Sequence, residues 1–247
     1  MNTIIEVCID SIESAVNAEA GGANRVELCD NLAEGGTTPS AGIISAVRAQ
    51  IGVGLQVMIR PRGGDFLYSP AEIEAMKYDI LVAKELRADG VVFGCLTKDA
   101  NVDMECMAEL IALARPMNVT FHRAFDMVRD PLSALNALIT LGVNRVLTSG
   151  QQPSALEGAP LIAELVRQAG DRIIILAGGG VRPYNIQQLI AQTGVRECHV
   201  SGRTILKSKM THKNQVVAMG STAHHSEYER LVVDSALIRS FRSASVS

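Results

Sequence analysis

The sequence contains no long apolar run and no basic segment near its start. A helix that spans a bilayer needs about 20 consecutive apolar residues, whereas the longest apolar stretch, which begins at Ile173, is short and rich in glycine. The first ten residues include Glu6 and Asp10 and lack the positive charges of a secretory signal. We therefore expect a cytoplasmic protein without membrane segments.

An excess of either charge is also missing. The 23 Lys and Arg residues are nearly matched by 26 Asp and Glu residues, which gives a formal net charge of -3. Nucleic acids and anionic membranes attract surfaces that are strongly basic. We therefore expect neither of them as a partner.

The five cysteines show no CxxC spacing, and several catalytic motifs are absent. A chain of 247 residues can form a large core, so scattered cysteines are expected to be free thiols, neither disulfides nor zinc ligands. The patterns GxSxG, HExxH and the P-loop do not occur. Lysine is missing from every strand that we predict below, which argues against Schiff-base chemistry.

What the sequence does contain is a regular alternation of two kinds of segment. Eight β-rich runs begin near Ile4, Asn24, Leu55, Asp89, Asn118, Asn144, Arg172 and Arg196. The segments between them are rich in Ala and Leu and have helical periodicity. This pattern predicts an α/β fold, a single (β/α)8 TIM-like barrel over residues 1–247, with an open doubly wound sheet as the alternative. An irregular segment, 206–224, is expected before a last helix near 226–242.

Capping residues suggest where four of the helices begin. A polar side chain before a proline at the first helical position is a typical helix start. The predicted starts are Thr38-Pro39, Ser69-Pro70, Asp130-Pro131 and Ser154, which has Glu157 at capping-box spacing.

Alternation along the strands sorts side chains between the barrel interior and the helix layer. In the first strand the β-branched Ile5 and Val7 suit the helix layer, which leaves Glu6 and Cys8 inward. The same rule places these residues inward: Glu27, Cys29, Met58, Arg60, Thr120, His122, Glu197, His199 and Ser201. Because functional groups gather at the carboxyl ends of barrel strands, we predict catalytic roles for Glu6, Glu27, Arg60, His122 and His199. A structural ion pair, for example between Glu27 and Arg60, is the alternative.

Two glycine-containing loops are candidate anion sites. In one, Arg60, Arg62 and Asp65 flank two glycines, a composition that suits a guanidinium clamp for a carboxylate or phosphate or, equally, a salt-bridged surface turn. The other comprises Gly179 and Gly180 after the seventh strand, with Ser201 after the eighth, where barrels often bind phosphate.

Two cysteines form a candidate metal site. Cys8 and Cys29 share the same parity at the ends of consecutive strands, whose backbones lie about 4.8 Å apart in a sheet. Two thiolates are soft ligands suited to Cu(I), with Met58 or His122 as further donors. Burial as small apolar side chains is the alternative.

A set of longer motifs resembles the CutC copper homeostasis family. They are EVC at Glu6, RVELC at Arg25, EGGTTPS at Glu34, MIRPRGGDFLYS at Met58, VTFHRAFDM at Val119, RVLTSGQ at Arg145, AGGGVR at Ala177 and HVSG at His199. The resemblance implies a cytoplasmic TIM-like barrel, a role in copper tolerance or copper binding, and assembly into an oligomer such as a homodimer. It also implies that the charged cleft includes Arg62, Asp65, Arg123 and Asp126.

Two functions therefore remain. The first is a copper homeostasis protein that binds a Cu(I) ion through cysteine thiolates. The alternative is a TIM-barrel enzyme that acts on a small anionic ligand, phosphorylated or carbohydrate-like, with His122 and a carboxylate as acid and base and the arginines as clamp. The sequence leaves the question of a catalysed reaction open.

Overall fold

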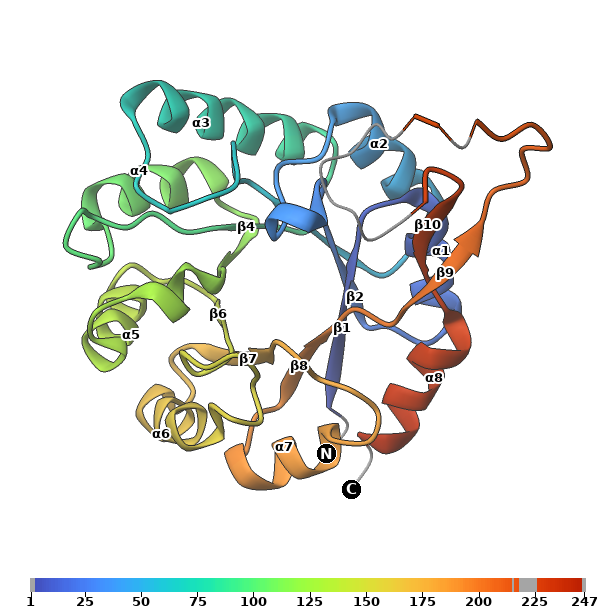
Figure 1. Cartoon of the computed structure of the whole chain (residues 1–247). Helices are drawn as coiled ribbons and strands as arrows, with labels where there is room; N and C mark the ends of the chain where they lie inside the picture. Colours follow the sequence, from blue (N-terminus) through green and yellow to red (C-terminus); the bar gives the residue numbers. More distant parts are fainter. Residues whose placement is uncertain (1–2, 215, 218–225, 246–247) are drawn as a thin grey trace.

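A closed barrel of eight parallel strands lies at the centre of the computed structural model, which describes residues 3–214, 216–217 and 226–245 (Figure 1). The strands are β1 (Ile4–Ile9), β2 (Arg25–Leu28), β3 (Gly54–Met58), β4 (Gly90–Phe93), β5 (Asn118–Phe121), β6 (Arg145–Thr148), β7 (Ile174–Gly178) and β8 (Glu197–Val200). Each strand pairs with its neighbours in sequence, and β1 also pairs with β8. The predicted barrel is confirmed, and the alternative of an open sheet is wrong.

Helices cover the outside of the barrel (Figure 1). They are α1 (Ile12–Ala20), α2 (Ala41–Gln50), α3 (Pro70–Glu85), α4 (Met104–Ala114), α5 (Pro131–Thr140), α6 (Ala159–Ala169), α7 (Ile186–Thr193) and α8 (Ser235–Ala244), with the 3₁₀ turns η1 (Leu32–Glu34) and η2 (Arg123–Met127). Ile5 and Val7 are fully buried beneath this layer, as their parity predicts. No helix in the described part of the chain is long and apolar enough to cross a bilayer.

Two of the four predicted helix starts are confirmed. Ser69 forms a complete capping box at the start of α3, and Asp130 caps α5. The prediction at Thr38-Pro39 is wrong, because Ser40 caps α2 and the Thr38 hydroxyl accepts the backbone N–H of Arg60 at 2.9 Å.

The prediction at Ser154 is also wrong. The Ser154 hydroxyl does accept the backbone N–H of Glu157, but this bond closes a turn, and α6 begins only after Gly158. A capping box and a hydrogen-bonded turn have the same local spacing, so the sequence pattern does not distinguish them.

An antiparallel hairpin beyond the barrel was not predicted. β9 (Arg203–Lys207) pairs with β10 (Glu229–Val233), which occupies part of the region predicted as the last helix. That helix, α8, begins only at Ser235, because the residues before it form β10, which pairs with β9 and packs beside α1. The predicted irregular segment overlaps the end of β9 and lies partly outside the described residues.

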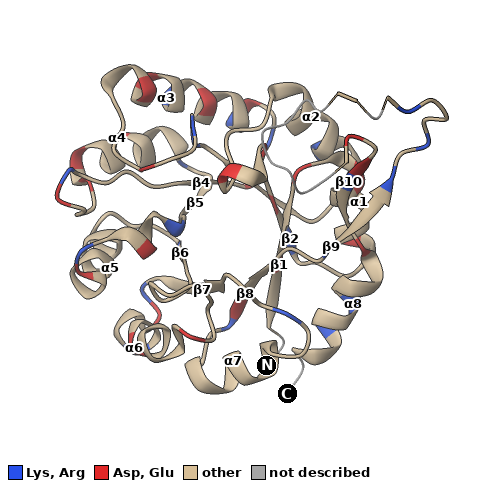
Figure 2. Ribbon diagram, viewed as in Figure 1, with Lys and Arg blue, Asp and Glu red and all other residues tan. Residues whose placement is uncertain are grey.

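Charged residues of both signs are interspersed over the outer helices (Figure 2). The interior of the barrel is different, because it contains several ionisable side chains that are more than 90% buried, among them Glu6, Glu27 and Glu197. Burying a charge is costly unless the charge is paired. The partners of these buried ionisable side chains therefore largely determine the properties of the site.

Gly90 makes room for an interior side chain at the start of β4. A Cβ atom at this position would lie 2.0 Å from Oε1 of Gln56 and 2.8 Å from the carbonyl oxygen of Asn118. We expect Gly90→Ala to lower the free energy of unfolding, measured in urea, by about 1–3 kcal/mol, which is typical of overpacking.

The matched control is Gly42→Ala, on the exposed face of α2. Its Cβ would lie 3.9 Å from the nearest atom outside its neighbours, Oγ of Ser40. Because alanine favours a helix by roughly 0.5–1 kcal/mol over glycine, this variant should be slightly more stable than the parent. Equal effects of the two substitutions would contradict the packing described around Gly90.

Candidate functional site

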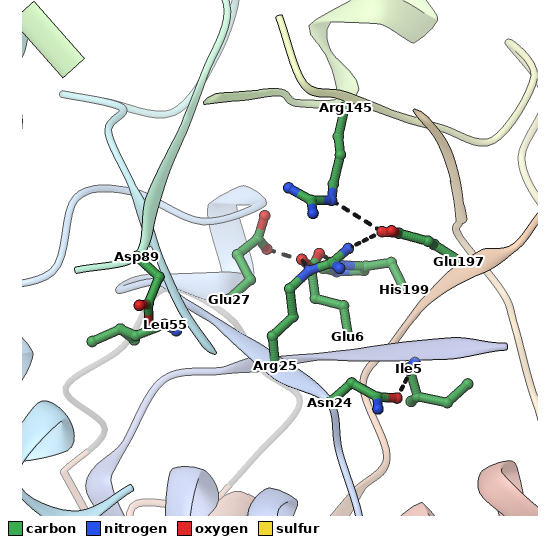
Figure 3. A network of polar contacts seen from close by, with 10 residues as sticks. All are labelled: Ile5, Glu6, Asn24, Arg25, Glu27, Leu55, Asp89, Arg145, Glu197 and His199. Carbon is green, nitrogen blue, oxygen red and sulfur yellow. Dashed lines mark hydrogen bonds and ion pairs between the residues drawn. The ribbon is translucent and has the colours of Figure 1, made fainter. Parts of the chain in front are cut away.

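Arg25 lies between two carboxylates inside the barrel (Figure 3). Its Nε donates to Oε2 of Glu6, and its Nη2 donates to Oε2 of Glu197. Arg145 adds a second cation, with Nε 3.0 Å from the same oxygen of Glu197. The interior thus contains a network of two arginines and two carboxylates, in which Arg25 contacts both carboxylates and Glu197 contacts both arginines.

His199 extends this network toward the mouth of the barrel. Its Nδ1–H donates to Oε1 of Glu6 at 2.8 Å, and its Nε2 lies 3.7 Å from Oε2 of Glu27. The strand register explains the convergence, because Glu6 lies opposite both His199 of β8 and Arg25 of β2, while Cys8 lies opposite Glu27. The predicted meeting of Glu6, Glu27 and His199 is therefore present in the structure.

Both predicted metal ligands lie next to this group. Cys8 packs against the cluster that contains Cys29, and Cys29 also contacts Oε2 of Glu27 at 3.5 Å. Met58 packs in the same small cluster as Cys29, which is buried. Donor atoms of Cys8, Glu27 and His199 all lie within 4.8 Å of one another, and they form the one such group of three in the described part of the chain.

The two carboxyl groups of the site have opposite properties. Burial raises the pKa of Glu6, but the charge of Arg25 and the hydrogen bond from His199 outweigh it and bring the pKa to about 2. Burial raises the pKa of Glu27 to about 8, although the charge of His199 partly offsets this. At neutral pH Glu6 is therefore ionised, whereas burial opposes the ionisation of Glu27 and the charge of His199 favours it.

The imidazole and the thiols are perturbed as well. Burial lowers the pKa of His199, yet the carboxylates of Glu27 and Glu6 and the Cys8 thiolate raise it well above its usual value. Hydrogen bonding from Cys29 lowers the pKa of Cys8 well below its usual range, and the same interaction with burial raises that of Cys29. The surroundings thus favour a protonated imidazole at His199 and favour ionisation of Cys8 over ionisation of Cys29.

Arg60 points at backbone, away from Glu27. Its Nη1 donates to the carbonyls of Glu34 and Gly36, and its Nη2 to that of Gly64, at 2.7, 3.0 and 2.8 Å. The residue is 5% exposed, and its Nε has no partner. Arg60 thus ties two loops of the barrel mouth together, and Glu27 pairs with His199.

His122 is buried apart from the cysteines. Its Nδ1 accepts the backbone N–H of Ala124 at 3.2 Å, and its ring lies 4.8 Å from that of Phe66. Burial and the charge of Arg60 lower its pKa to about 3, and its Nε2 has no partner. His199, and not His122, is the imidazole beside Cys8.

The predicted anion-binding arginines contact protein groups. Arg62 donates to Glu72 at 2.6 Å and to Asp65 at 3.0 Å, which is the arrangement of a salt-bridged turn. Arg123 pairs with Asp126 at 2.7 Å and donates to the Ser149 hydroxyl at 2.7 Å.

The predicted glycines lie near the second of these pairs. Gly179 has a φ of +100°, and a Cβ there would lie 3.1 Å from Cβ of Ser149 and 3.7 Å from Cζ of Arg123. Gly180 also has a positive φ, and Ser201 follows β8 in a partly buried position. Glycine at position 179 is therefore favoured by the positive φ and by the close side chain of Ser149.

Sequence reasoning missed Arg25 and Arg145. Arg25 lies two residues before Glu27 and thus shares its inward parity, so a signal was available for it. Its two carboxylate partners come from β1 and β8, and only the register between strands identifies them.

Comparison with known proteins connects this site to a family. The model of the CutC family matches residues 3–204, which include all eight barrel strands and end within β9. The copper homeostasis protein cutC homolog of mouse is 54% identical over 236 residues, which cover 96% of this chain and 87% of the mouse protein. The human homolog is 53% identical over 96% of this chain and 86% of its own length, and a CutC family protein of Parabacteroides distasonis is 52% identical over 98% and 100%.

Solved structures agree with the fold. A CutC crystal structure from Streptococcus agalactiae superposes with a TM-score of 0.78 at 37% identity and covers 81% of this chain and 98% of that one. Phosphoribosylanthranilate isomerase of Thermotoga maritima, with a TM-score of 0.58 and 14% identity over 98% of both chains, shares the fold alone. The names of the relatives favour the copper hypothesis over the enzyme alternative.

The buried neutral His122 makes stability depend on pH. Its pKa in the folded protein is about 3, below the ordinary value of 6.5. Between these two pH values the imidazole of His122 is therefore protonated only in the unfolded chain. Stability from this residue is complete above pH 6.5 and is lost as the pH falls toward 3. One titrating group changes the free energy of unfolding by up to about 1.4 kcal/mol per pH unit. When the pH falls from 7.5 to 5, the free energy of unfolding of His122→Asn should therefore decrease by roughly 2 kcal/mol less than that of the parent.

The measurement is a series of urea unfolding curves over that pH range. Asparagine retains an acceptor for the N–H of Ala124 but does not titrate. The control is His212→Asn at an exposed position, which should follow the parent at every pH. If the free energy of unfolding decreases equally with falling pH in the parent and in His122→Asn, His122 is not the source of the pH dependence.

Proposed function

Because the chain belongs to the CutC family, we propose that it acts in copper homeostasis by binding Cu(I) through the thiolates of Cys8 and Cys29. The observation that carries the proposal is that Cys8 and Cys29 pack in one small cluster at the ends of β1 and β2, inside the barrel mouth. A copper ion is the protein's partner in this function.

The donor chemistry suits this ion. Cu(I) prefers soft thiolate and thioether ligands, and the Cys8 thiol already has a lowered pKa while Met58 packs against Cys29. Cys29 is buried and has a raised pKa, so binding of the ion would release its proton. The bound cation would replace that proton, which keeps the buried charge of the two-sulfur group low.

A third donor is available on each side of the thiols. His199 lies within 4.8 Å of Cys8 through one of its ring nitrogens, and Met58 supplies a thioether beside Cys29. The bond to Glu6 occupies Nδ1 and leaves Nε2 available, but the raised pKa of His199 means that this nitrogen would have to lose its proton before it coordinated the ion. Met58 has no proton to lose, and we therefore favour a site of two thiolates and one thioether.

The cellular setting fits the same proposal. The relatives from mouse and man are named as copper homeostasis proteins. Free thiols persist in reducing compartments such as the cytoplasm, which is the location that we infer for this protein.

The test is retention of Cu(I) by the reduced protein under anaerobic conditions in competition with a chromogenic Cu(I) chelator. Loss of a residue that only supports a metal ligand already costs roughly 10–100-fold in affinity, so Cys8→Ser and Cys29→Ser should each cost about 100-fold or more. Met58→Leu should weaken binding less than either, and His199→Gln less than Met58→Leu.

The matched control is Cys95→Ser combined with Cys106→Ser, because these cysteines also form a buried pair, but one beneath the helices. This variant should keep the affinity of the parent. Urea unfolding checks that each serine variant is folded. If the Cys8 and Cys29 variants hold Cu(I) as tightly as the parent, or if the parent yields all its copper to a weak chelator, the proposal fails.

A further inference from the structure

A second pair of thiols lies outside the candidate copper site. Cys95 follows β4, and Cys106 lies in the first turn of α4; they are 2% and 6% exposed. Their side chains interact with each other. Because this pair faces the helix layer, it is separate from the inward-facing group at Cys8 and Cys29.

The backbone holds the two cysteines together through Asp103. The N–H of Asp103 donates to the carbonyl of Cys95 at 3.0 Å, and its carboxylate accepts the N–H of Cys106 at 3.1 Å. An isolated β-bridge between Leu96 and Val102 closes the intervening loop. These ties limit how far the two thiols can separate while the protein is folded.

The surroundings of this pair differ from those of the copper site. Among the described residues, the group of three His, Cys, Asp or Glu donors within 4.8 Å comprises Cys8, Glu27 and His199 and no atom of the second pair. Cys95 and Cys106 instead belong to the large apolar core between strands and helices. A charged residue, Asp103, does lie beside the pair, and it contacts the backbone of Cys106. Two close thiols can form a disulfide, which needs no third group.

The two sulfurs are also unequal. Interaction with Cys95 lowers the pKa of Cys106 although burial opposes it, and the first turn of a helix favours a thiolate. The same interaction and burial raise the pKa of Cys95. Cys106, which lies in the first turn of α4 and is the more exposed of the two, is therefore the nucleophile, and Cys95 attacks second.

We propose that Cys95 and Cys106 form a redox-active dithiol, a modification site that a low-molecular-weight disulfide converts to an intramolecular disulfide. The Cys106 thiolate attacks one sulfur of R–S–S–R, which forms Cys106–S–S–R and releases one R–S⁻. Cys95 then loses its proton and attacks Sγ of Cys106, which forms the Cys95–Cys106 bond and releases the second R–S⁻. Two protein thiols are oxidised, and the reagent is reduced to two thiols.

The modification has a local structural effect. It joins the end of β4 to the start of α4 across a loop whose centre, from Lys98 to Asn101, lies at the surface. Closing this loop covalently reduces the freedom of the unfolded chain. The oxidised protein should therefore unfold at a higher temperature than the reduced protein.

The experiment treats the reduced, metal-free full chain with oxidised glutathione, blocks remaining thiols with iodoacetamide and maps the peptides by mass spectrometry. We expect a peptide pair linked through Cys95 and Cys106, a loss of about 2 Da from the mass of the chain before alkylation, and a raised Tm that dithiothreitol reverses. Cys8→Ser combined with Cys29→Ser should give the same link, so a failure of the copper proposal leaves this result unchanged.

Single variants test the order of the two steps. Cys95→Ser should stop at one glutathione on Cys106, and Cys106→Ser should leave Cys95 unmodified. The proposal is overturned if the parent retains glutathione on Cys106 without forming the link. It is also overturned if, after treatment of the folded protein with oxidised glutathione, both thiols are still alkylated by iodoacetamide. The same treatment of protein unfolded in urea should then still oxidise these thiols, which shows that the reagent was active.

Discussion

The pairing of Arg25 with two carboxylates is the interaction on which the barrel interior depends. A guanidinium buried without partners costs several kcal/mol, and Glu6 and Glu197 together supply the necessary acceptors. Because the charge of Arg25 lowers the pKa of Glu6, Glu6 is an anion that raises the pKa of His199, and His199 in turn faces Glu27. The charge state at the mouth therefore follows from a cation deeper in the barrel.

Much of the fold was predictable because its signals are local. Eight β-rich runs separated by helical segments correspond to the eight barrel strands, and Ser69 and Asp130 begin helices as expected. The errors arose where one local pattern fits two structures. Ser154 forms a turn with capping-box spacing, and Glu229–Val233 forms a strand because a partner, Arg203–Lys207, lies beside it. Sequence periodicity does not reveal a partner that is more than twenty residues away.

The site was predictable at the level of which side chains face inward. Parity alone brought Glu6, Glu27, His199 and the cysteines to one mouth, and the structure contains that group. Parity does not give contacts, because these depend on the stagger between strands. Arginine adds a further difficulty, since its long side chain reaches whatever acceptors are near. Arg62 binds Glu72 and Asp65.

The closure of the barrel between β1 and β8 also has a temporal consequence. Cys8 and Glu6 belong to the first barrel strand that leaves the ribosome, whereas His199 belongs to the last. Until β8 has been synthesised and has docked against β1, Glu6 lacks its imidazole partner, and the donors around Cys8 are incomplete. A nascent chain can carry the first thiols without presenting this site, so the assembled group of donors marks a barrel whose synthesis is complete.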